Sequence, residues 1–364
     1  MSRAAGRALR IAVIAGDGIG PEVTAEGVRL LELCAKLCGL PLDVWRLDLG
    51  AERWLADGTG LTPALREEIR ETCAAVLLGA LGDPRIADHA HARDILFGLR
   101  FGFDLYANVR PSRALADRLV PLAGRRKHDV DLVVFRENTE GLYAGIGGQL
   151  RRGTAQEIAI EEDVNTRAGV ERIVRAAFEH ARRERRPLCL TDKSNALRHA
   201  HDLWQRVYQE LRVQYADVAA EHLYIDALCY ELVRNPGRFG VIVCCNLFGD
   251  IVSDLAAALA GGLGLQPSAS LNPENRGPGL FEPVHGSAPA LAGKGSANPL
   301  AMLRSVALLL AELGCGQAQL AVEAAATAAI EVRECTSDIG GTLSTRDAAD
   351  AVLDRVAAAL GPTA

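Results

Sequence analysis

Three aspartates in two short segments have the residue type and spacing that suit a divalent metal ion. Asp250 and Asp254 lie four residues apart in NLFGDIVSD, and Asp226 lies upstream in YIDALCYEL. Positions four apart share one face of a helix, so the first two carboxylates point the same way. Apolar runs flank both, and a buried carboxylate needs a partner. Oxygen ligands favour Mg²⁺ or Mn²⁺ over zinc, so we predict a metal site rather than a solvated helix face.

Three arginines beside apolar runs could bind carboxylates. Arg100 and Arg110 lie in LRFGFDLYANVRPSR, and Arg136 lies in VVFREN. A guanidinium group can bind a carboxylate through two parallel hydrogen bonds, so the set could hold a dicarboxylic acid. Each arginine taken singly could equally pair with a structural acid.

Lys193 and Tyr143 are candidates for proton transfer. Lys193 follows the apolar run PLCLT, and Tyr143 ends the segment RENTEGLY. A partly desolvated lysine at the end of a strand can have a lowered pKa and act as a general base, with the tyrosine as the paired acid. Either residue alone could also be structural or exposed.

Two glycine-containing segments differ in what they indicate. GDGIGP at 16–21 follows a strand-like run, but Pro21 stands where the dinucleotide fingerprint needs its third glycine. Proline favours the first position of a helix, so we interpret this segment as a tight strand-to-helix turn. In FEPVHGSAPALAGKGSANP (281–299), the small residues after His285 allow the backbone to approach a flat or phosphorylated ligand closely.

The elements that position these residues alternate along the chain. We predict strands at 11–16, 43–47, 74–79, 131–135, 187–191 and 240–245, and helices that include 21–38, 166–184, 199–212 and 247–261. This alternation is typical of an α/β protein with a largely parallel sheet. The stretch 142–164 predicts an antiparallel excursion that could pair with a second subunit. Three helical periods occupy 298–360.

Composition excludes several classes of partner. The 364 residues have a net charge of −6, which gives no reason to expect nucleic acid or an anionic membrane as a partner. No apolar run approaches the roughly 20 residues that span a bilayer. A strand-like run begins by residue 9, too early for a signal or transit peptide, and the nine cysteines form no C-x-x-C motif. We therefore expect reduced thiols and a cytoplasmic location.

In this order, the segments resemble the β-decarboxylating dehydrogenases of the isocitrate and isopropylmalate type. The resemblance extends from IAVIAGDGIGPEV to SDIGGTLST, and NLFGDIVSDLAA together with FEPVHGSAP is highly specific. It implies a two-lobed α/β/α fold of the isopropylmalate dehydrogenase kind, distinct from the Rossmann fold. It also implies a discontinuous cofactor domain at 1–105 and 261–364. A small domain at 106–260 would then hold the metal and substrate residues, the dimer interface and the arm at 142–164.

The chemistry implied by the resemblance is the oxidation of a 3-substituted malate, loss of its carboxylate and protonation of a metal-stabilised enolate. Lys193 matches the residue that removes the hydroxyl proton, and Tyr143 the residue that reprotonates the enol. The substrate clamp matches Arg100, Arg110 and Arg136, and the metal site matches Asp226, Asp250 and Asp254. In such homodimers Lys193 and Asp226 reach across from the neighbouring subunit, and Asp226 also contacts substrate.

The segment HARDILFGLR indicates the substrate. Leu96 and Phe97 occupy the positions that face the variable substituent, and two apolar side chains favour an isopropyl group. The expected reaction is therefore the conversion of 3-isopropylmalate to 2-oxoisocaproate in leucine biosynthesis. Arg93 could instead bind an anionic tail, as in homoisocitrate or a related analogue, and RENTEGLY is similar to the homoisocitrate and tartrate branches. A catalytically silent regulatory subunit would have lost part of the metal or acid–base set, which is complete here.

The cofactor residues implied by the resemblance lie in three segments. They are His285, Gly286, Ser287, Ala288, Asn298, Asp338 and Asn195. Ala290 replaces the aspartate that NAD-using members place on the ribose hydroxyls, and no Lys-Tyr pair for a ribose phosphate replaces it. Asp338 fits the NAD-using branch, so we expect NAD, bound weakly.

Overall fold

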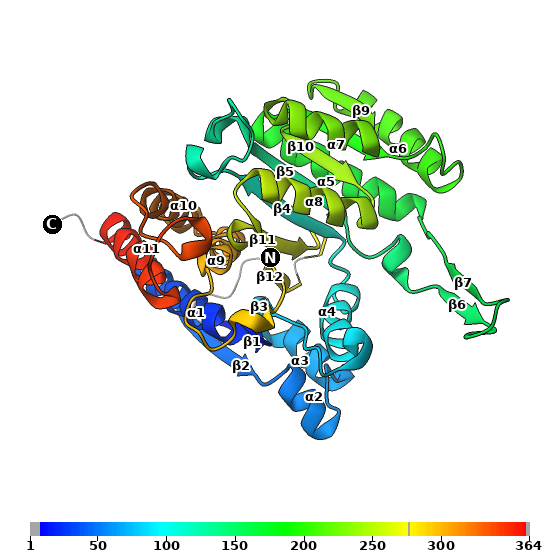
Figure 1. Ribbon diagram of the computed structural model, residues 1–364. Coiled ribbons are helices and arrows are strands. Elements are labelled where there is room, and N and C mark those ends of the chain that lie inside the picture. Colours follow the sequence, from blue (N-terminus) through cyan, green and yellow to red (C-terminus); the bar gives the residue numbers. More distant parts are fainter. Residues whose placement is uncertain (1–7, 276, 362–364) are drawn as a thin grey trace.

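The computed structural model describes residues 8–275 and 277–361 and contains one large mixed sheet with helices on both faces (Figure 1). The strand order is β2-β1-β3-β12-β11-β4-β5-β10-β8-β9. Strands at both ends of the sheet pair in parallel, whereas β12, β11, β4 and β5 pair in antiparallel fashion at the centre. This order is not that of the Rossmann fold, as the sequence predicted.

The strands and helices have the following bounds. The strands are β1 Leu9–Gly16, β2 Leu42–Leu47, β3 Ala75–Ala80, β4 Ala107–Arg113, β5 Asp131–Glu137, β6 Gly147–Leu150, β7 Ile158–Glu161, β8 Leu188–Asp192, β9 Ala220–Tyr224, β10 Val241–Cys244, β11 Pro267–Leu271 and β12 Gly279–Pro283. The α-helices are α1 Gly20–Leu37, α2 Ala51–Asp57, α3 Pro63–Thr72, α4 Ala90–Gly102, α5 Arg167–Glu184, α6 Ala200–Gln214, α7 Ile225–Arg234, α8 Asn246–Leu259, α9 Leu300–Glu312, α10 Gly316–Glu331 and α11 Thr345–Leu360.

The six predicted strands are confirmed within a few residues, as are the four predicted helices and the three helices near the C-terminus. The sequence did not predict β4, β9, β11 and β12. Proline and arginine in ANVRPSR (107–113) weaken the strand pattern of β4, and β11 begins with Pro267. Their neighbours in the sheet, rather than their own residues, make these segments strands.

Alternating strand residues fill separate cores on the two faces of the sheet. Ile11 and Val13 of β1 pack with α1, α9, α10 and α11, whereas Ala12 and Ile14 pack with α3 and α4. At the other end of the sheet, β5 and β10 pack in the same alternating way with α5 and α6 on one face and α7 and α8 on the other. Strands buried on both faces read as continuous apolar runs, which explains why the sequence revealed them.

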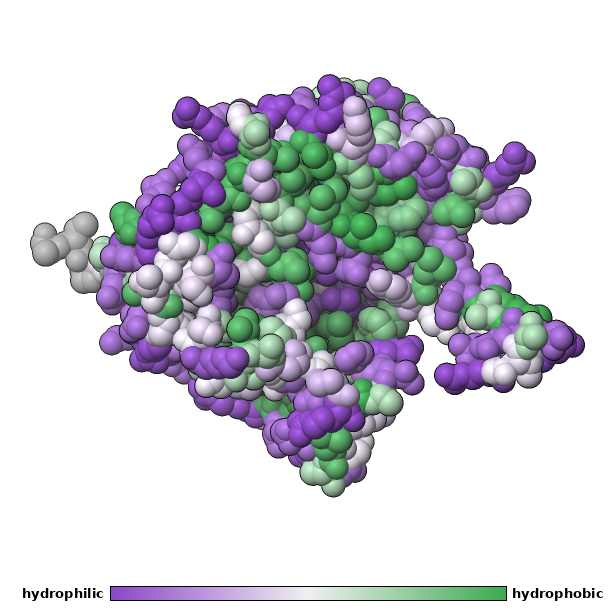
Figure 2. All heavy atoms as spheres, viewed as in Figure 1, coloured by the Kyte–Doolittle hydropathy of each residue, from purple (hydrophilic) through white to green (hydrophobic). Residues whose placement is uncertain are grey.

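The predicted excursion is a two-stranded antiparallel ribbon, β6–β7, that projects from the body of the molecule as an arm (Figure 1). Leu150 lies opposite Ile158, and Ile160 lies two residues further along the same face. All three side chains are exposed, at 58%, 44% and 45%. Apolar residues gather on this arm in Figure 2. A face of this kind is typical of an interface.

No helix in the described part of the chain is long and apolar enough to cross a membrane. All nine cysteines are free thiols. The basic segments at 124–128 and 182–186 form exposed ion pairs such as Lys127–Glu331 and Arg182–Asp217, as expected of solvated faces.

Candidate active site

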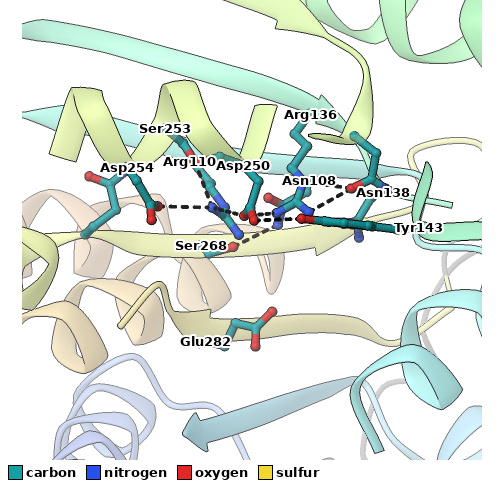
Figure 3. A network of polar contacts seen from close by, with 12 residues as sticks. Asn108, Arg110, Arg136, Asn138, Tyr143, Asp250, Ser253, Asp254, Ser268 and Glu282 are labelled. Carbon is teal, nitrogen blue, oxygen red and sulfur yellow. Dashed lines mark hydrogen bonds and ion pairs between the residues drawn. The ribbon is translucent and has the colours of Figure 1, made fainter. Parts of the chain in front are cut away.

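Helix α8 places Asp250 and Asp254 beside arginines of β4 and β5 (Figure 3). Oδ1 of Asp250 lies 2.5 Å from Nη1 of Arg136 and 3.1 Å from Nη1 of Arg110. Gly249 makes this approach possible, because a Cβ there would lie 2.5 Å from Cγ of Arg136. The helix can therefore rest directly on the arginine side chain.

The three predicted arginines are buried and fixed by side-chain partners. Their exposed fractions are 6% for Arg100, 5% for Arg110 and 2% for Arg136. Nη2 of Arg100 donates to Glu282 at 2.9 Å, Nη1 of Arg110 to Ser253 at 2.8 Å, and Nη2 of Arg136 to Asn246 at 2.7 Å. Burial lowers the pKa of Arg110 and, together with the nearby Arg110, that of Arg136. Guanidinium groups keep their charge at neutral pH, so the site favours an anion.

Tyr143 faces the same carboxylate. Its hydroxyl donates to Oδ2 of Asp250 at 3.3 Å, and the guanidinium of Arg136 lies 5.4 Å from its ring centroid. Burial and the negative charge of Asp250 raise the pKa of Tyr143. The hydroxyl is therefore protonated at neutral pH and can give up a proton to a stronger base.

The two α8 carboxylates differ in their environment. Burial raises the pKa of Asp250, but Arg136, Arg110 and Arg100 outweigh it and hold the pKa below its usual value. Burial and Asp250 raise the pKa of Asp254, which lies 3.7 Å from Arg110 and is half exposed. A bound cation would relieve the repulsion between the two carboxylates, and their oxygens are the ligands that Mg²⁺ and Mn²⁺ prefer.

Asp226 is not brought to this pair within one chain. No group of three or more His, Cys, Asp or Glu residues in the described part of the chain could hold a metal ion. Asp226 lies in the first turn of α7, and its Oδ1 lies 2.7 Å from Nζ of Lys193, which follows β8. The hydrogen bond from Lys193 lowers the pKa of Asp226. The third carboxylate and the candidate base thus form a separate pair.

Buried side chains fix the backbone around Lys193. The amide of Lys193 donates to Nδ1 of His201 at 2.8 Å, and burial lowers the pKa of that histidine. Asp192, which is 1% exposed, accepts hydrogen bonds from the amide of Ser194 at 2.9 Å and from Nε2 of His222 at 3.0 Å. His201 and Asp192 therefore hold in place the backbone of the turn that contains Lys193.

A cavity of about 350 Å³ joins the arginine cluster to helix α4. Its lining includes four arginines, two carboxylates and the apolar side chains of Leu96 and Phe97. In Figure 2 it is a hollow with hydrophilic residues at its floor, between α8 and α4. The excess of positive charge suits a doubly charged acid, and the apolar wall suits an uncharged substituent.

The predicted cofactor segment borders the same cavity. His285 and Gly286 line it, and the carbonyl of Ser287 accepts a hydrogen bond from the amide of Ile19 at 2.8 Å. Nε2 of His285 is buried without a partner among the described residues, and burial lowers the pKa of the ring. This neutral, unpaired nitrogen fits a cofactor hydroxyl or amide. Ala288 adopts a left-handed conformation, with φ 37°.

Three further predicted cofactor residues lie apart from the cavity lining. Nδ2 of Asn298 donates to Oδ2 of Asp338 at 2.9 Å, so these two residues form a pair of their own. Asn195 lies in an exposed turn after β8.

The sequence missed several polar residues of the site. Glu282 is 8% exposed and is the buried partner of Arg100. Nδ2 of Asn108 on β4 donates to the hydroxyl of Ser268 on the neighbouring strand β11, at 2.8 Å (Figure 3). The sequence did contain a signal for Glu282, because this acid stands between Phe281 and Pro283 in an apolar run. Nothing local marked the other two residues.

Comparison with known proteins shows what the chain resembles. Residues 10–352 match the family described as isocitrate/isopropylmalate dehydrogenase. The chain is 47% identical to 3-isopropylmalate dehydrogenase of Thermobifida fusca, with 96% of this chain and 98% of the relative aligned. It is 44% identical to the enzyme of the same name from Mycobacterium marinum, with 97% and 100% aligned.

Two solved structures are also similar. Isocitrate dehydrogenase of Methylococcus capsulatus superposes with a TM-score of 0.86 and 37% identity, over 96% of this chain and 99% of that one. A β-decarboxylating dehydrogenase of Thermococcus kodakarensis superposes with a TM-score of 0.78 and 36% identity, over 96% of both chains.

Proposed function

The chain belongs to the isocitrate/isopropylmalate dehydrogenase family, and on this premise we propose that it oxidises and decarboxylates 3-isopropylmalate to 2-oxoisocaproate in leucine biosynthesis. Relatives named 3-isopropylmalate dehydrogenase are 43–47% identical over nearly the whole chain and support this substrate. The supporting observation from the structure is the cavity, which combines excess positive charge with an apolar wall.

Different residues of the cavity would bind different parts of the substrate. Arg100, Arg110 and Arg136 bind and orient the two substrate carboxylates, since their guanidinium groups already converge on one side of the cavity. Leu96 and Phe97 of α4 enclose the isopropyl group. Buried arginines held by fixed partners cost little reorganisation when the substrate binds.

We assign Asp250, Asp254 and Asp226 as the ligands of Mg²⁺ or Mn²⁺. When bound, the cation supplies Lewis-acid polarisation of the substrate hydroxyl and stabilises the enolate charge. Asp250 keeps its charge at neutral pH because three arginines hold its pKa low. It is therefore ready to act as a ligand without losing a proton.

Lys193 accepts the hydroxyl proton, and Tyr143 donates a proton to the enol carbon. The hydroxyl of Tyr143 lies in the cavity beside Asp250 and keeps its proton at neutral pH. Lys193 pairs with Asp226 outside the cavity of its own chain, so we propose that both serve the active site of a second copy. The exposed apolar arm and Ile251 on α8, which is 55% exposed, support a homodimer.

We assign NAD as the hydride acceptor. It would bind along residues 285–288, with Asn298 and Asp338, and with Asn195 of the turn that follows Lys193. The unpaired Nε2 of His285 supports a ligand at this place. Ala290 is exposed and offers no side-chain hydrogen bond to a ribose. Lack of a charged hydrogen bond costs roughly 1.5–3 kcal/mol, so we expect weak NAD binding.

We also propose the division of the chain into a cofactor domain, 1–105 with 261–364, and a small domain, 106–260. The separate cores on β1–β3 and on β5, β8 and β10 support it, although one sheet runs through both. Nine free thiols support a reducing compartment, and we propose the cytoplasm.

The test is NADH or NADPH formation by the purified protein with Mg²⁺, using 3-isopropylmalate, homoisocitrate, isocitrate, tartrate and malate in parallel. Preference for 3-isopropylmalate with NAD⁺ is the expected result. A chelator should abolish the activity, and added Mg²⁺ or Mn²⁺ should restore it. Absence of turnover with every substrate would contradict the proposal.

One observation favours a second substrate class. Arg93 is exposed at the edge of the cavity, on the helix that also presents Leu96 and Phe97. It could bind an anionic substituent. Activity with homoisocitrate that falls in Arg93→Ala, while activity with 3-isopropylmalate is low in both proteins, would assign this class instead.

A further inference from the structure

His91 and Asp17 form a buried contact between residues that have no role in the proposed reaction. Nε2 of His91 lies 2.8 Å from Oδ2 of Asp17, and the two residues are 0% and 7% exposed. A carboxylate only accepts hydrogen bonds, so Nε2 is the donor. The other ring nitrogen, Nδ1, has no partner among the described residues. The hydrogen bond to Asp17 is therefore what fixes the orientation of this ring.

Asp17 joins segments that are distant in the sequence. Its Oδ1 accepts from the amide of Ala51 at 2.6 Å, at the start of α2. Its Oδ2 also accepts from the amide of Gly82 at 2.7 Å, in the loop after β3. Its own amide donates to the carbonyl of Ala80 at 2.7 Å. The carboxylate thus ties the β1–α1 turn to α2, to the end of β3 and, through His91, to α4.

The same turn also holds the cofactor segment. The amide of Ile19 donates to the carbonyl of Ser287 at 2.8 Å. Gly18 has φ +58°, and a Cβ there would lie 2.0 Å from that carbonyl oxygen, so only glycine permits the approach. The segment GDGIGP (16–21) lacks the third glycine of a dinucleotide fingerprint. It instead links the cofactor segment to α4 and sets the distance between them.

The start of α4 depends on contacts from outside the helix. The helix has no side-chain cap, and two consecutive non-glycine residues before it, Asp88 and His89, have φ 54° and 49°. Such conformations persist only where the surroundings fix them. Two side chains of α4 provide this: His91 donates to Asp17, and Asp94 accepts from the amide of Leu61 at 2.7 Å.

We propose that His91 is a positioning residue whose hydrogen bond to Asp17 sets helix α4 at a fixed distance from the cofactor segment. The inference rests on the proposed function. Because α4 presents Leu96, Phe97 and Arg100 to the cavity, a displaced helix would bind the substrate less well. The turn that contains Asp17 also holds the carbonyl of Ser287, through the amide of Ile19. The same displacement therefore weakens cofactor binding. The pair acts on binding and not on the proton transfers.

The test compares His91→Phe, which keeps a ring but removes the donor, with His91→Gln, which can donate from its amide. For the first variant we expect KM for 3-isopropylmalate to rise roughly fivefold or more, KM for NAD to rise in parallel and kcat to stay within about twofold. The glutamine variant should recover most of the loss. Unchanged KM values with only a lowered melting temperature would overturn the proposal.

A second measurement does not depend on turnover. Hydrogen exchange of amides 90–102 in the ligand-free protein should be faster in His91→Phe than in the parent and should be restored in His91→Gln. If the parent protein shows no turnover, the proposed function fails, and this exchange comparison alone decides the positioning role. Equal exchange in all three proteins would overturn it. If the phenylalanine variant does not fold, His91→Ala replaces it.

Discussion

Single residues in this protein owe their chemical properties to burial and to charged neighbours. Asp250 and Asp254 lie one helical turn apart, yet the pKa of the first is lowered and that of the second is raised. Arg136 and Arg110 contact the first carboxylate and Arg100 adds its charge, whereas the second carboxylate lies 3.7 Å from Arg110 and is half exposed. Residue type and spacing identified the pair, but the protein environment separates its two members.

At the same scale, Lys193→Met should lower kcat by roughly 10²–10⁴-fold, because methionine keeps the aliphatic stem but cannot accept a proton. The backbone of this turn should keep its place, since Asp192 and His201 hold it. Steady-state NADH formation measures the loss, and Lys36→Met, at an exposed position of α1, is the matched control. Turnover near the parent level would exclude Lys193 as the base.

Asp192 should give the stability a specific pH dependence. Burial raises its pKa, but hydrogen bonds from His222, Ser194 and Gln205 outweigh burial and lower the pKa below the usual value. Its contribution is therefore present above the unfolded-state pKa of about 3.9 and is lost as pH falls through the lower folded-state value.

Asp192→Asn should accordingly destabilise the protein by about 1.5–3 kcal/mol at pH 7 and by progressively less below about pH 4. Denaturant unfolding at several pH values measures the difference. Asp202→Asn, in an exposed pair with Arg206, is the control and should cost under about 0.5 kcal/mol. A difference that does not change with pH would contradict the linkage.

Elements fix the geometry that residues cannot fix alone. Helix α8 can rest on Arg136 because Gly249 lacks a side chain, and β4 presents Arg110 to the cavity because its two antiparallel neighbours hold it in the sheet. The arm is the opposite case, since no helix in the described part of the chain covers β6 and β7 (Figure 1). Its apolar face is stable in water only if another surface covers it.

We therefore expect Ile158→Lys combined with Ile160→Lys to dissociate the proposed homodimer, because the charges of both lysines would be buried in its interface. Light scattering after size-exclusion chromatography measures the mass. Ala159→Lys, on the other face of the same strand, is the control and should leave the assembly intact. An unchanged mass in the double variant would place the interface elsewhere.

At the scale of the whole molecule, the predicted site residues of one chain lie in two separate places. Asp250, Tyr143 and the arginines line one cavity, with Asp254 3.7 Å from Arg110, while Lys193 and Asp226 pair outside it. If the second copy completes the site, two inactive variants should complement each other. Lys193→Met and Asp250→Asn damage opposite sides of the shared site.

Equal mixing of these two variants with subunit exchange should restore about a quarter of the parent activity, since half the dimers are mixed and each has one intact site. Each variant alone should remain inactive. Mixing Lys193→Met with Asp226→Asn, which alter the same side, is the control and should restore nothing. Recovery in that control, or none in the first mixture, would contradict sharing across the dimer.

The sequence determined the class of fold and the family, and it predicted which groups react. Strands that are buried on both faces are visible as apolar runs, and helices as apolar residues at helical spacing. NLFGDIVSD with FEPVHGSAP matches a known family. All of these signals lie within short stretches of the chain. Only the tertiary structure decided which distant residues meet. Glu282 beside Arg100, Asp17 beside His91, and Lys193 apart from the cavity depend on strand order and helix placement. Contacts between residues far apart in the chain are set by topology, and no short pattern encodes them.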